Sequence, residues 1–328
     1  MNNFSNTNYI GILYKMNVLL FPGQGSQVVG MGNEFYKNFE KVKEIFNNAD
    51  EKLKFSISKL ILEGPEDQLK LTQNTQPAIL TVSYAIFKVL KDEFKFDFSK
   101  FKYFAGHSLG EYTALVCSGS LKFTDAVYLL SERGKAMQEA VPIGKGNMIA
   151  VLGTKISDIE KLLGKHNQTN GVCEIANDNA EGQVILSGEK NSVNVFQDNL
   201  KTNKIKFIPL KVSAPFHCSL MKSAADKMIE KINKIQFEKP LFKIINNVTA
   251  EPIEEPGEIK KLLFQQIFST VQWRKSLIKM SDEGIKNYIE VGPGKVLTGM
   301  VKRTIKNAKT FSINTIADIK NLENEFKR

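Results

Sequence analysis

The residues best suited to chemistry lie at 106–110 and read Gly-His-Ser-Leu-Gly. This G-x-S-x-G pattern falls between a short apolar strand expected at 101–105 and a helix expected at 109–117. Small residues on both sides allow a sharp turn that exposes the serine hydroxyl, and the N–H groups that begin the helix point at developing negative charge. We therefore predict that Ser108 is a nucleophile, with an ordinary tight turn as the alternative. Glu111, in the first turn of the same helix, needs only the helix dipole to explain it.

A nucleophilic serine needs a base, and the chain contains only three histidines. His107 adjoins the serine on the turn, so its side chain should point elsewhere. His166 lies in a polar stretch that indicates an exposed loop. His217 follows Pro215, where the chain is expected to leave an inserted subdomain, and such a junction borders a cleft. We predict His217 as the base, with a structural loop histidine as the alternative.

Arg133 stands out because the chain uses lysine almost everywhere and has only a few arginines. The planar guanidinium binds a carboxylate through two parallel hydrogen bonds, which a lysine cannot reproduce. We predict that Arg133 recognises a carboxylate. The alternative is an arginine on a helix surface that pairs with Glu132 or Glu139.

The glycine-containing loop at 23–27 follows the first strand and invites a phosphate-binding interpretation. We reject it because no G-x-G-x-x-G is present and the Gly-Pro-Gly-Lys segment at 292–295 lacks the spacing of a P-loop. The turn at 106–110 instead suggests an oxyanion-binding role for the backbone N–H of Leu109.

The elements that must position these residues alternate between strand and helix, which is typical of an α/β domain. Strands are expected at 18–21, 101–105, 244–248 and 288–291, and helices at 33–53, 109–117, 297–306 and from a first-turn proline at Pro77.

Between residues 146 and 212 the rhythm changes to a compact β-α-β-β-α-β series. We therefore predict a large, mostly parallel α/β-hydrolase-like domain at 16–145 and 213–328, with an inserted ferredoxin-like α+β subdomain at 146–212 and a cleft between them. Residues 1–15 are expected to form a flexible N-terminal extension rather than a signal peptide. Strands of the insert are expected at 147–152, 172–176, 183–187 and 206–212, the last at a sheet edge because Pro209 lacks an N–H donor.

The composition favours an ordinary soluble protein, since 42% of the residues are hydrophobic and 24% are charged, with no apolar run long enough to span a membrane. Three cysteines without metal-ligand spacing indicate reduced thiols in a cytosol and neither zinc nor another metal. The net charge of +10 comes from scattered lysines, so no nucleic-acid partner is expected, and we expect a cytoplasmic monomer.

Seven short motifs distributed from Val18 onward resemble those of malonyl-CoA:acyl carrier protein transacylases, the FabD-type acyltransferase family. They lie at 21–27, 73–78, 106–112, 133–134, 216–217, 271–273 and 290–294. The resemblance implies a Ser108–His217 dyad whose histidine is oriented by the backbone carbonyl of Gln266. It also implies an oxyanion hole formed by the N–H groups of Gln27 and Leu109. The alternative for Gln27 is an amide that only stabilises its loop.

The same resemblance implies that a malonyl group moves from malonyl-CoA to the phosphopantetheine thiol of an acyl carrier protein through a seryl ester, supplying fatty acid synthesis. Arg133 would bind the malonyl carboxylate, which acetyl lacks. Coenzyme A enters as part of the substrate, and no cofactor is expected. A serine hydrolase or thioesterase and a catalytically silent docking module remain as alternatives. Arg133 disfavours the first, and the presence of Ser108, His217 and Arg133 together disfavours the second.

Overall fold

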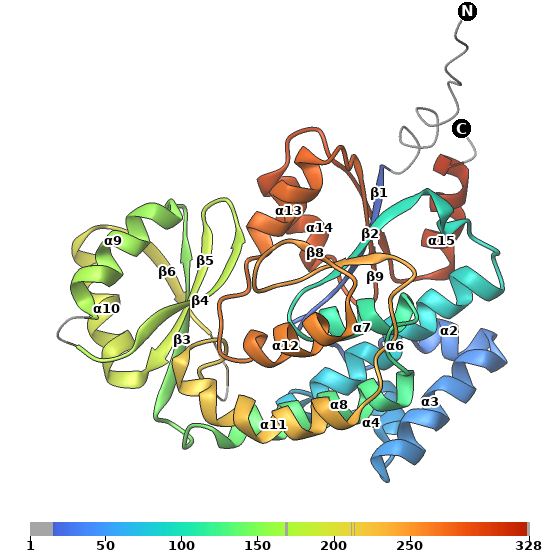
Figure 1. Ribbon diagram of the computed structural model, residues 1–328, viewed down its shortest axis with the longest axis horizontal. Coiled ribbons are helices and arrows are strands. Elements are labelled where there is room, and N and C mark those ends of the chain that lie inside the picture. The colour runs from blue at the N-terminus through green and yellow to red at the C-terminus, as the bar shows by residue number, and fades with distance from the viewer. Residues whose placement is uncertain (1–15, 168–169, 211, 213, 327–328) are drawn as a thin grey trace, which may run out of the picture.

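The sheet that carries the larger part of the protein is built on β1 (Asn17–Phe21), whose five residues are all buried. A continuous apolar run of this kind is typical of a parallel strand with helices on both faces. In the computed structural model, which describes residues 16–167, 170–210, 212 and 214–326, the strand order is β10-β9-β1-β2-β7-β8 (Figure 1). The expected extension at 1–15 lies outside the described residues.

Four of the five pairings in this six-stranded sheet are parallel, and only β8 runs antiparallel to its neighbour β7. The α/β class with a mostly parallel sheet is therefore confirmed. The other strands are β2 (Phe101–Gly106), β7 (Lys243–Ile245), β8 (Pro252–Ile253), β9 (Asn287–Val291) and β10 (Lys309–Ile313).

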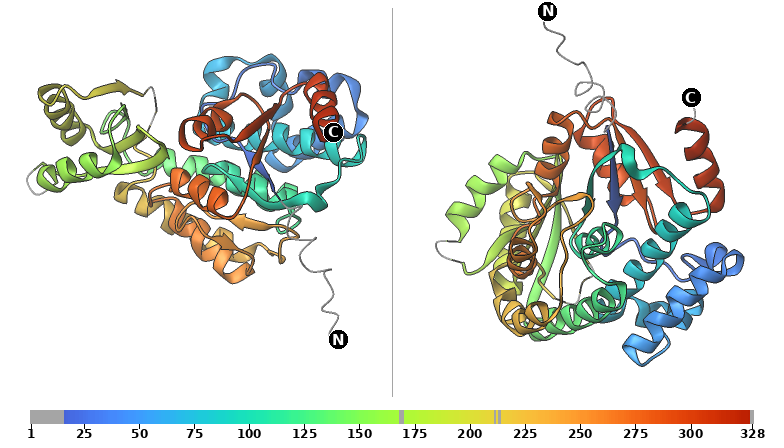
Figure 2. Two further views of the ribbon diagram at one scale, coloured as in Figure 1. Left: turned by 90° about the horizontal axis from the view of Figure 1, so that it is seen from above. Right: turned by 45° about the vertical axis from the view of Figure 1, so that its right-hand side comes forward.

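Helices surround this sheet on both faces in the two views of Figure 2. They are α2 (Asn33–Asn38), α3 (Glu40–Leu53), α4 (Ile57–Glu63), α5 (Glu66–Leu69), α6 (Thr72–Asp92), α7 (Leu109–Cys117), α8 (Phe123–Glu139), α11 (Lys222–Lys234), α12 (Pro256–Gln266), α13 (Trp273–Asp282), α14 (Val296–Thr304) and α15 (Ile316–Phe326). Short 3₁₀ turns lie at η1 (Phe98–Lys100) and η2 (Ser219–Met221). None of the helices in the described residues has the length and apolar character to cross a bilayer.

A second, four-stranded antiparallel sheet of order β4-β5-β3-β6 forms the end of the molecule at the left of Figure 1. Alternate residues of β3 face opposite ways, as the two-residue period of a strand requires. Ile149 and Val151 pack with the helices of the insert, whereas Met148 and Ala150 join the core of the larger part. The elements are β3 (Gly146–Leu152), α9 (Ile156–His166), β4 (Cys173–Ala180), β5 (Gln183–Glu189), α10 (Lys190–Thr202) and β6 (Lys206–Pro209).

Pro209 ends the edge strand β6, as its missing donor predicts. The strand expected at 206–212 is shorter than predicted, since β6 stops at Pro209, and residue 211 lies outside the described residues. The strand expected at 244–248 also ends early, at Ile245.

The single helix expected at 33–53 is wrong, because Phe39 is extended (φ −131°, ψ 119°) and separates α2 from α3. The ring of Phe39 stacks on Phe35 at 6.3 Å between centroids. The break lets both short helices turn their apolar faces to the core.

Pro77 is not in the first turn of its helix, as predicted, but inside α6. The helix begins earlier because the carbonyl of Leu71 accepts hydrogen bonds from the N–H groups of both Asn74 and Thr75, each at 2.8 Å. Pro77 has no N–H to donate to the carbonyl of Gln73, and burial of the surrounding residues offsets this lost bond.

Candidate active site

Ser108 occupies the corner between β2 and α7 with φ 53° and ψ −109°, outside the regions that L-residues ordinarily adopt. A Cβ atom at Gly106 would lie 1.9 Å from the carbonyl carbon and oxygen of Gly110. One at Gly110 would lie 2.2 Å from the carbonyl oxygen of Phe21. Both glycines are therefore required sterically, because β1, β2 and the start of α7 meet here backbone to backbone.

Substituting Gly106→Ala should lower the free energy of unfolding by more than about 4 kcal/mol, because backbone atoms would have to move apart. Gly164→Ala is the matched control: Gly164 lies in α9, and a Cβ there meets nothing within 4 Å. It should leave stability unchanged or raise it by up to about 1 kcal/mol. Urea unfolding of both variants checks this, and a Gly106→Ala protein as stable as the parent would contradict the steric argument.

The hydroxyl of Ser108 contacts the base predicted from the sequence: its Oγ lies 2.8 Å from Nε2 of His217. Nδ1 of His217 lies 2.8 Å from the backbone carbonyl oxygen of Gln266. A carbonyl can only accept, so Nδ1 carries the proton and Nε2 is free to accept from the serine.

Gln266 is the last residue of α12, and the final carbonyls of a helix have no intrahelical donor. They also carry the negative end of the helix dipole. The carbonyl of Gln266 therefore orients the imidazole of His217 and favours positive charge on it, two functions for which a triad uses a carboxylate.

Burial, with a contribution from the nearby Arg133 charge, lowers the pKa of His217 to about 3. The ring is consequently neutral, and able to take a proton, throughout the neutral pH range.

The rate of serine acylation should therefore keep its full histidine-dependent value as pH falls through 6.5 and decline only well below pH 5. Stability should also depend on pH. At pH values between the folded pKa of His217, about 3, and its unfolded pKa of 6.5, the unfolded chain binds a proton at this residue that the folded chain does not. The contribution of His217 to stability is thus present above pH 6.5 and is lost as pH falls toward 3. Rapid-quench acylation across this range checks the rate, and a break near pH 6.5 would contradict the lowered pKa. A His217→Gln protein should lose less stability over the same range.

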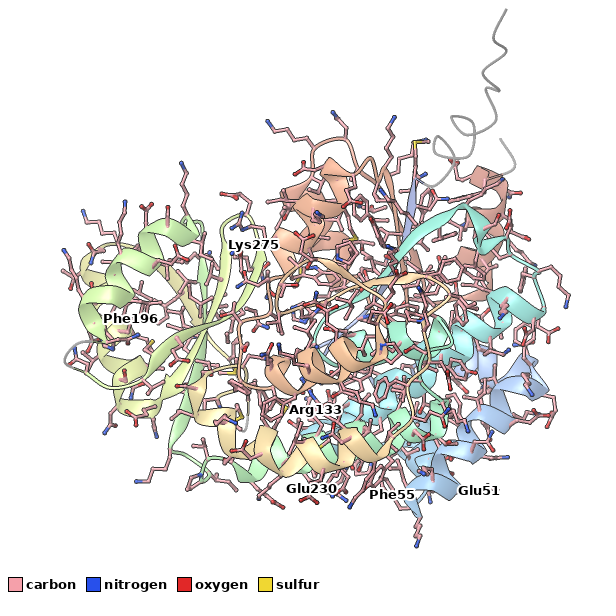
Figure 3. All side chains as sticks on the ribbon, in the orientation of Figure 1. Glu51, Phe55, Arg133, Phe196, Glu230 and Lys275 are labelled. Carbon is pink, nitrogen blue, oxygen red and sulfur yellow. The ribbon has the colours of Figure 1, made fainter. Side chains whose placement is uncertain are left out.

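Arg133 is 1% exposed and lies in the interior of the larger part (Figure 3). Its guanidinium donates to Oε1 of Gln76 at 2.7 Å, to Oε1 of Gln266 at 2.9 Å and to Oγ of Ser108 at 3.1 Å, while its Nε has no hydrogen-bond partner in the described part of the chain. The hydrogen-bond partners of Arg133 in the described part of the chain are thus two amides and a hydroxyl, and none is a carboxylate. A buried charge without a counter-ion in contact is costly, so the site fits an anion that arrives beside the nucleophile.

The surface pairing that was the alternative for Arg133 is wrong. Glu132 pairs instead with Lys135 and Lys231, both at 2.9 Å, and Glu139 pairs with Lys227 at 2.8 Å. These carboxylates point outward from α8, whereas Arg133 points inward.

Three polar residues that sequence reasoning did not assign to the site complete it. Asn247 accepts the N–H of Ser108 at 2.6 Å and donates to the carbonyl of Gly106 at 2.8 Å, so it holds both sides of the corner. It follows β7 at the carboxyl edge of the parallel strands, a position that could have singled it out. Gln76 anchors the guanidinium of Arg133 and lies in one of the motifs that carry the resemblance. The third is Glu111.

Glu111 does more than complement a helix dipole, so that explanation is wrong. Its side chain is 1% exposed and accepts hydrogen bonds from Nε2 of Gln266 at 2.7 Å and from the N–H of Asn247 at 3.0 Å. Its position in α7 brings the carboxyl under the corner, where tertiary packing rather than the helix terminus determines its partners.

The two backbone groups expected to bind an oxyanion lie in the corner and in the loop after β1. Leu109 is the first residue of α7, where a helix leaves the N–H without an intrahelical partner. Gln27 is half-buried, and its Oε1 accepts the N–H of Gly25 at 2.7 Å, as in the loop-stabilising alternative. The loop begins against the corner, since a Cβ at Gly23 would lie 2.7 Å from the carbonyl of His107. The oxyanion role of both N–H groups stays a prediction.

The remaining histidines lie apart from the serine hydroxyl. Nε2 of His107 lies 2.8 Å from Oδ1 of Asn179 in β4. Its ring therefore points away from the serine hydroxyl, as expected, and toward β4. The exposed loop predicted for His166 is wrong: this residue ends α9, is 4% exposed and contacts Oγ of Ser192 at 2.9 Å. Packing of α9 against α10 buries it.

A cavity of about 440 Å³ opens beside His217, between β4 of the insert and the chain that follows α12. Its lining includes Glu174, Ile175, Phe268 and Thr270. The described residues contain no group of three or more His, Cys, Asp or Glu side chains that could hold a metal ion.

A serine at a strand-to-helix corner, a neutral histidine held by a carbonyl and a buried guanidinium beside the nucleophile define a serine enzyme that handles acyl groups. Residues 18–328 match a family model described as the acyl transferase domain. The chain is 42% identical over 297 residues to the malonyl CoA-acyl carrier protein transacylase of Bacillus subtilis (strain 168), covering 90% of this chain and 92% of that protein.

Solved structures show the same similarity. The acyl-carrier-protein S-malonyltransferase from Bartonella henselae superposes with a TM-score of 0.92 at 37% identity, covering 95% of this chain and 99% of that one. A type II PKS acyl-carrier protein in complex with its malonyl-transacylase gives a TM-score of 0.90 at 36% identity, covering 94% and 100%. The chain belongs to the acyl transferase family, among the malonyl CoA-acyl carrier protein transacylases.

Proposed function

We propose that this protein transfers a malonyl group from malonyl-CoA to the phosphopantetheine thiol of an acyl carrier protein, in support of fatty acid synthesis. The observation that carries the proposal is the guanidinium of Arg133, buried without a carboxylate in contact and 3.1 Å from Oγ of Ser108. A hydrolase acting on uncharged acyl groups has no use for a buried cation at that position.

In the first half-reaction Oγ of Ser108 attacks the thioester carbonyl carbon while its proton passes to Nε2 of His217. The tetrahedral intermediate collapses, the carbon–sulfur bond breaks, and the coenzyme A sulfur takes the proton from His217. A malonyl ester on Ser108 remains. In the second half-reaction the carrier thiol gives its proton to His217 and attacks this ester, and Ser108 recovers the proton as it leaves.

The carbonyl oxygen becomes negative in each tetrahedral intermediate. We assign its stabilisation to the N–H groups of Gln27 and Leu109. Removing one such donor typically costs about 10² to 10³ in rate. The malonyl carboxylate would bind Nε of Arg133, which has no hydrogen-bond partner among the described residues, and would take over the Nη2 donor that contacts Ser108. That exchange frees the nucleophile as the substrate arrives.

The domain organisation is also part of the proposal. The large domain at 16–145 and 213–328 has the strand-to-helix nucleophile corner expected of an α/β-hydrolase-like fold. A ferredoxin-like description of 146–212 is supported by its sheet: numbered within the insert, the strand order is 2-3-1-4. The cavity beside His217 then lies where the two domains meet.

We further propose a cytoplasmic monomer that acts without metal or redox cofactor and has neither nucleic-acid nor membrane partners. Chemistry supports the lack of a cofactor, since proton transfer through His217 and one carboxylate-binding arginine suffice for both half-reactions. All three cysteines, Cys117, Cys173 and Cys218, are unpaired and buried, in keeping with a reducing compartment.

Intact-mass spectrometry after mixing with malonyl-, methylmalonyl- and acetyl-CoA tests the proposal. We expect one malonyl group on Ser108, little or no acetyl, and loss of the adduct on addition of holo carrier protein. The product assay separates the rival enzyme class: free malonate as the main product would make the protein a hydrolase. Failure of Ser108 to take up malonyl would leave a docking module.

A further inference from the structure

The carboxyl of Glu111 lies at the centre of the site, and only one of its two oxygens accepts hydrogen bonds from the described residues. Oε2 accepts the two hydrogen bonds from Gln266 and Asn247, whereas Oε1, equally buried, has no hydrogen-bond partner among the described residues. A buried carboxylate oxygen without a donor is costly to keep charged. The carboxyl is therefore a place where a proton can be added without breaking an existing contact.

The side-chain amide of Gln266 bridges Arg133 and Glu111 by hydrogen bonds. Arg133 donates to Oε1 of Gln266, and Nε2 of the same side chain donates to Oε2 of Glu111, at 2.9 and 2.7 Å. The guanidinium and the carboxylate thus balance each other across Gln266 without forming a direct ion pair.

A substrate carboxylate that binds Arg133 upsets this balance. Two negative groups would then share one buried positive charge, and like charges in a poorly solvated interior repel strongly. Protonation of one carboxylate relieves this repulsion. The substrate's carboxylate is in direct contact with the guanidinium, so the carboxylate that is protonated is that of Glu111.

We propose that Glu111 is the internal counter-ion of Arg133 and that it takes up a proton from the solvent when the malonyl carboxylate binds, so that the buried charge stays balanced. This inference rests on the proposed function. The added proton resides on Oε1, and Oε2 continues to accept from Gln266 and Asn247. The carbonyl of Gln266 consequently keeps its hold on His217 in both protonation states.

The other titratable groups around Glu111 are not poised to take this role. Tyr112, next to it on α7, has its pKa raised to about 12 by burial and stays neutral. His217 and His107, which approach from the far side of Gln266 and from the corner, have lowered pKa values, each chiefly because of burial. For Glu111, burial outweighs its donors and Arg133 and raises the pKa to about 7, so a further negative charge suffices to protonate it near neutrality.

Calorimetry of malonyl-CoA binding to the Ser108→Ala protein tests this, because acylation cannot occur there. Titration at about pH 8 in buffers of different ionisation enthalpy gives the number of protons taken up. We expect an uptake approaching one proton per malonyl-CoA bound and none with acetyl-CoA, which brings no carboxylate. The same titration in a Ser108→Ala, His217→Gln protein should give the same uptake.

Adding Glu111→Gln to Ser108→Ala should retain malonyl-CoA binding and abolish the uptake. Binding without uptake in the Ser108→Ala protein, or uptake unchanged by Glu111→Gln, would overturn the inference. Absence of any malonyl-CoA binding would instead count against the proposed function. If Glu111→Gln does not fold, infrared difference spectra of the Ser108→Ala protein decide. A protonated-carboxyl band must appear on malonyl-CoA binding that neither free malonyl-CoA nor acetyl-CoA binding produces, and its absence refutes the inference.

Discussion

Ser108→Ala should lower the turnover number for malonyl transfer by about 10⁶-fold, and His217→Ala should lower it by a similar factor. The reason is that both side chains serve one proton transfer, across the 2.8 Å between Oγ of Ser108 and Nε2 of His217. Without the serine no ester forms, and without the histidine the hydroxyl keeps its proton and attacks poorly.

The double variant should be scarcely slower than either single variant, since residues that act as one unit are not additive. Single-turnover transfer from malonyl-CoA to holo carrier protein measures all three. Ser99→Ala, at an exposed serine of η1 that lies at the opposite end of β2 from the corner, is the matched control and should transfer at the parental rate. Thermal unfolding shows whether each variant is folded. A double variant that loses the product of the two single effects would mean that the residues act independently.

Arg133→Ala should reverse the preference between malonyl and acetyl groups. Two charge-assisted hydrogen bonds, worth about 1.5 to 3 kcal/mol each, are lost for malonyl. The value of kcat/KM for malonyl-CoA should consequently fall by about 10² to 10⁴, whereas the low value for acetyl-CoA, which makes no such bonds, should change little. Parallel measurement of kcat/KM for both thioesters tests this.

Arg133→Lys should restore only part of the malonyl activity, because an ammonium keeps the charge but not the fork. Arg303→Ala is the matched control. Arg303 is exposed on α14, and its one hydrogen bond to a described residue goes to Gln183. It should leave both substrates unaffected. Equal loss for malonyl and acetyl in Arg133→Ala would show a structural role and exclude carboxylate recognition.

The order of the elements around the nucleophile was readable from local pattern. An apolar strand, two glycines flanking a serine and an apolar helix lie within residues 101–117, and the structure has β2 and α7 where these residues predict them. Such a corner depends on side-chain size at neighbouring positions, and the local sequence specifies that size directly. The β-α-β-β-α-β series of the insert was readable for the same reason.

Three of the predictions that proved wrong concern burial. Phe39 interrupts a helical pattern to reach a core, and His166 lies in a polar stretch that α10 covers. Glu111 has the appearance of a first-turn acid, yet it contacts residues 136 and 155 positions away. Neither hydropathy nor periodicity reports which distant element will cover a given residue.

Motif and composition were thus sufficient to predict the α/β class, the pairing of Ser108 with His217 among three histidines and the family, because each prediction depends on residue type and near-neighbour spacing. Only the folded chain decided that α12 ends with its carbonyl on His217, that Asn247 holds the corner and that Arg133 is buried without a carboxylate in contact. The contact of His217 with Gln266 spans 49 positions and that of Ser108 with Asn247 spans 139. The energies of such contacts depend on desolvation, a property that exists only once the core has closed.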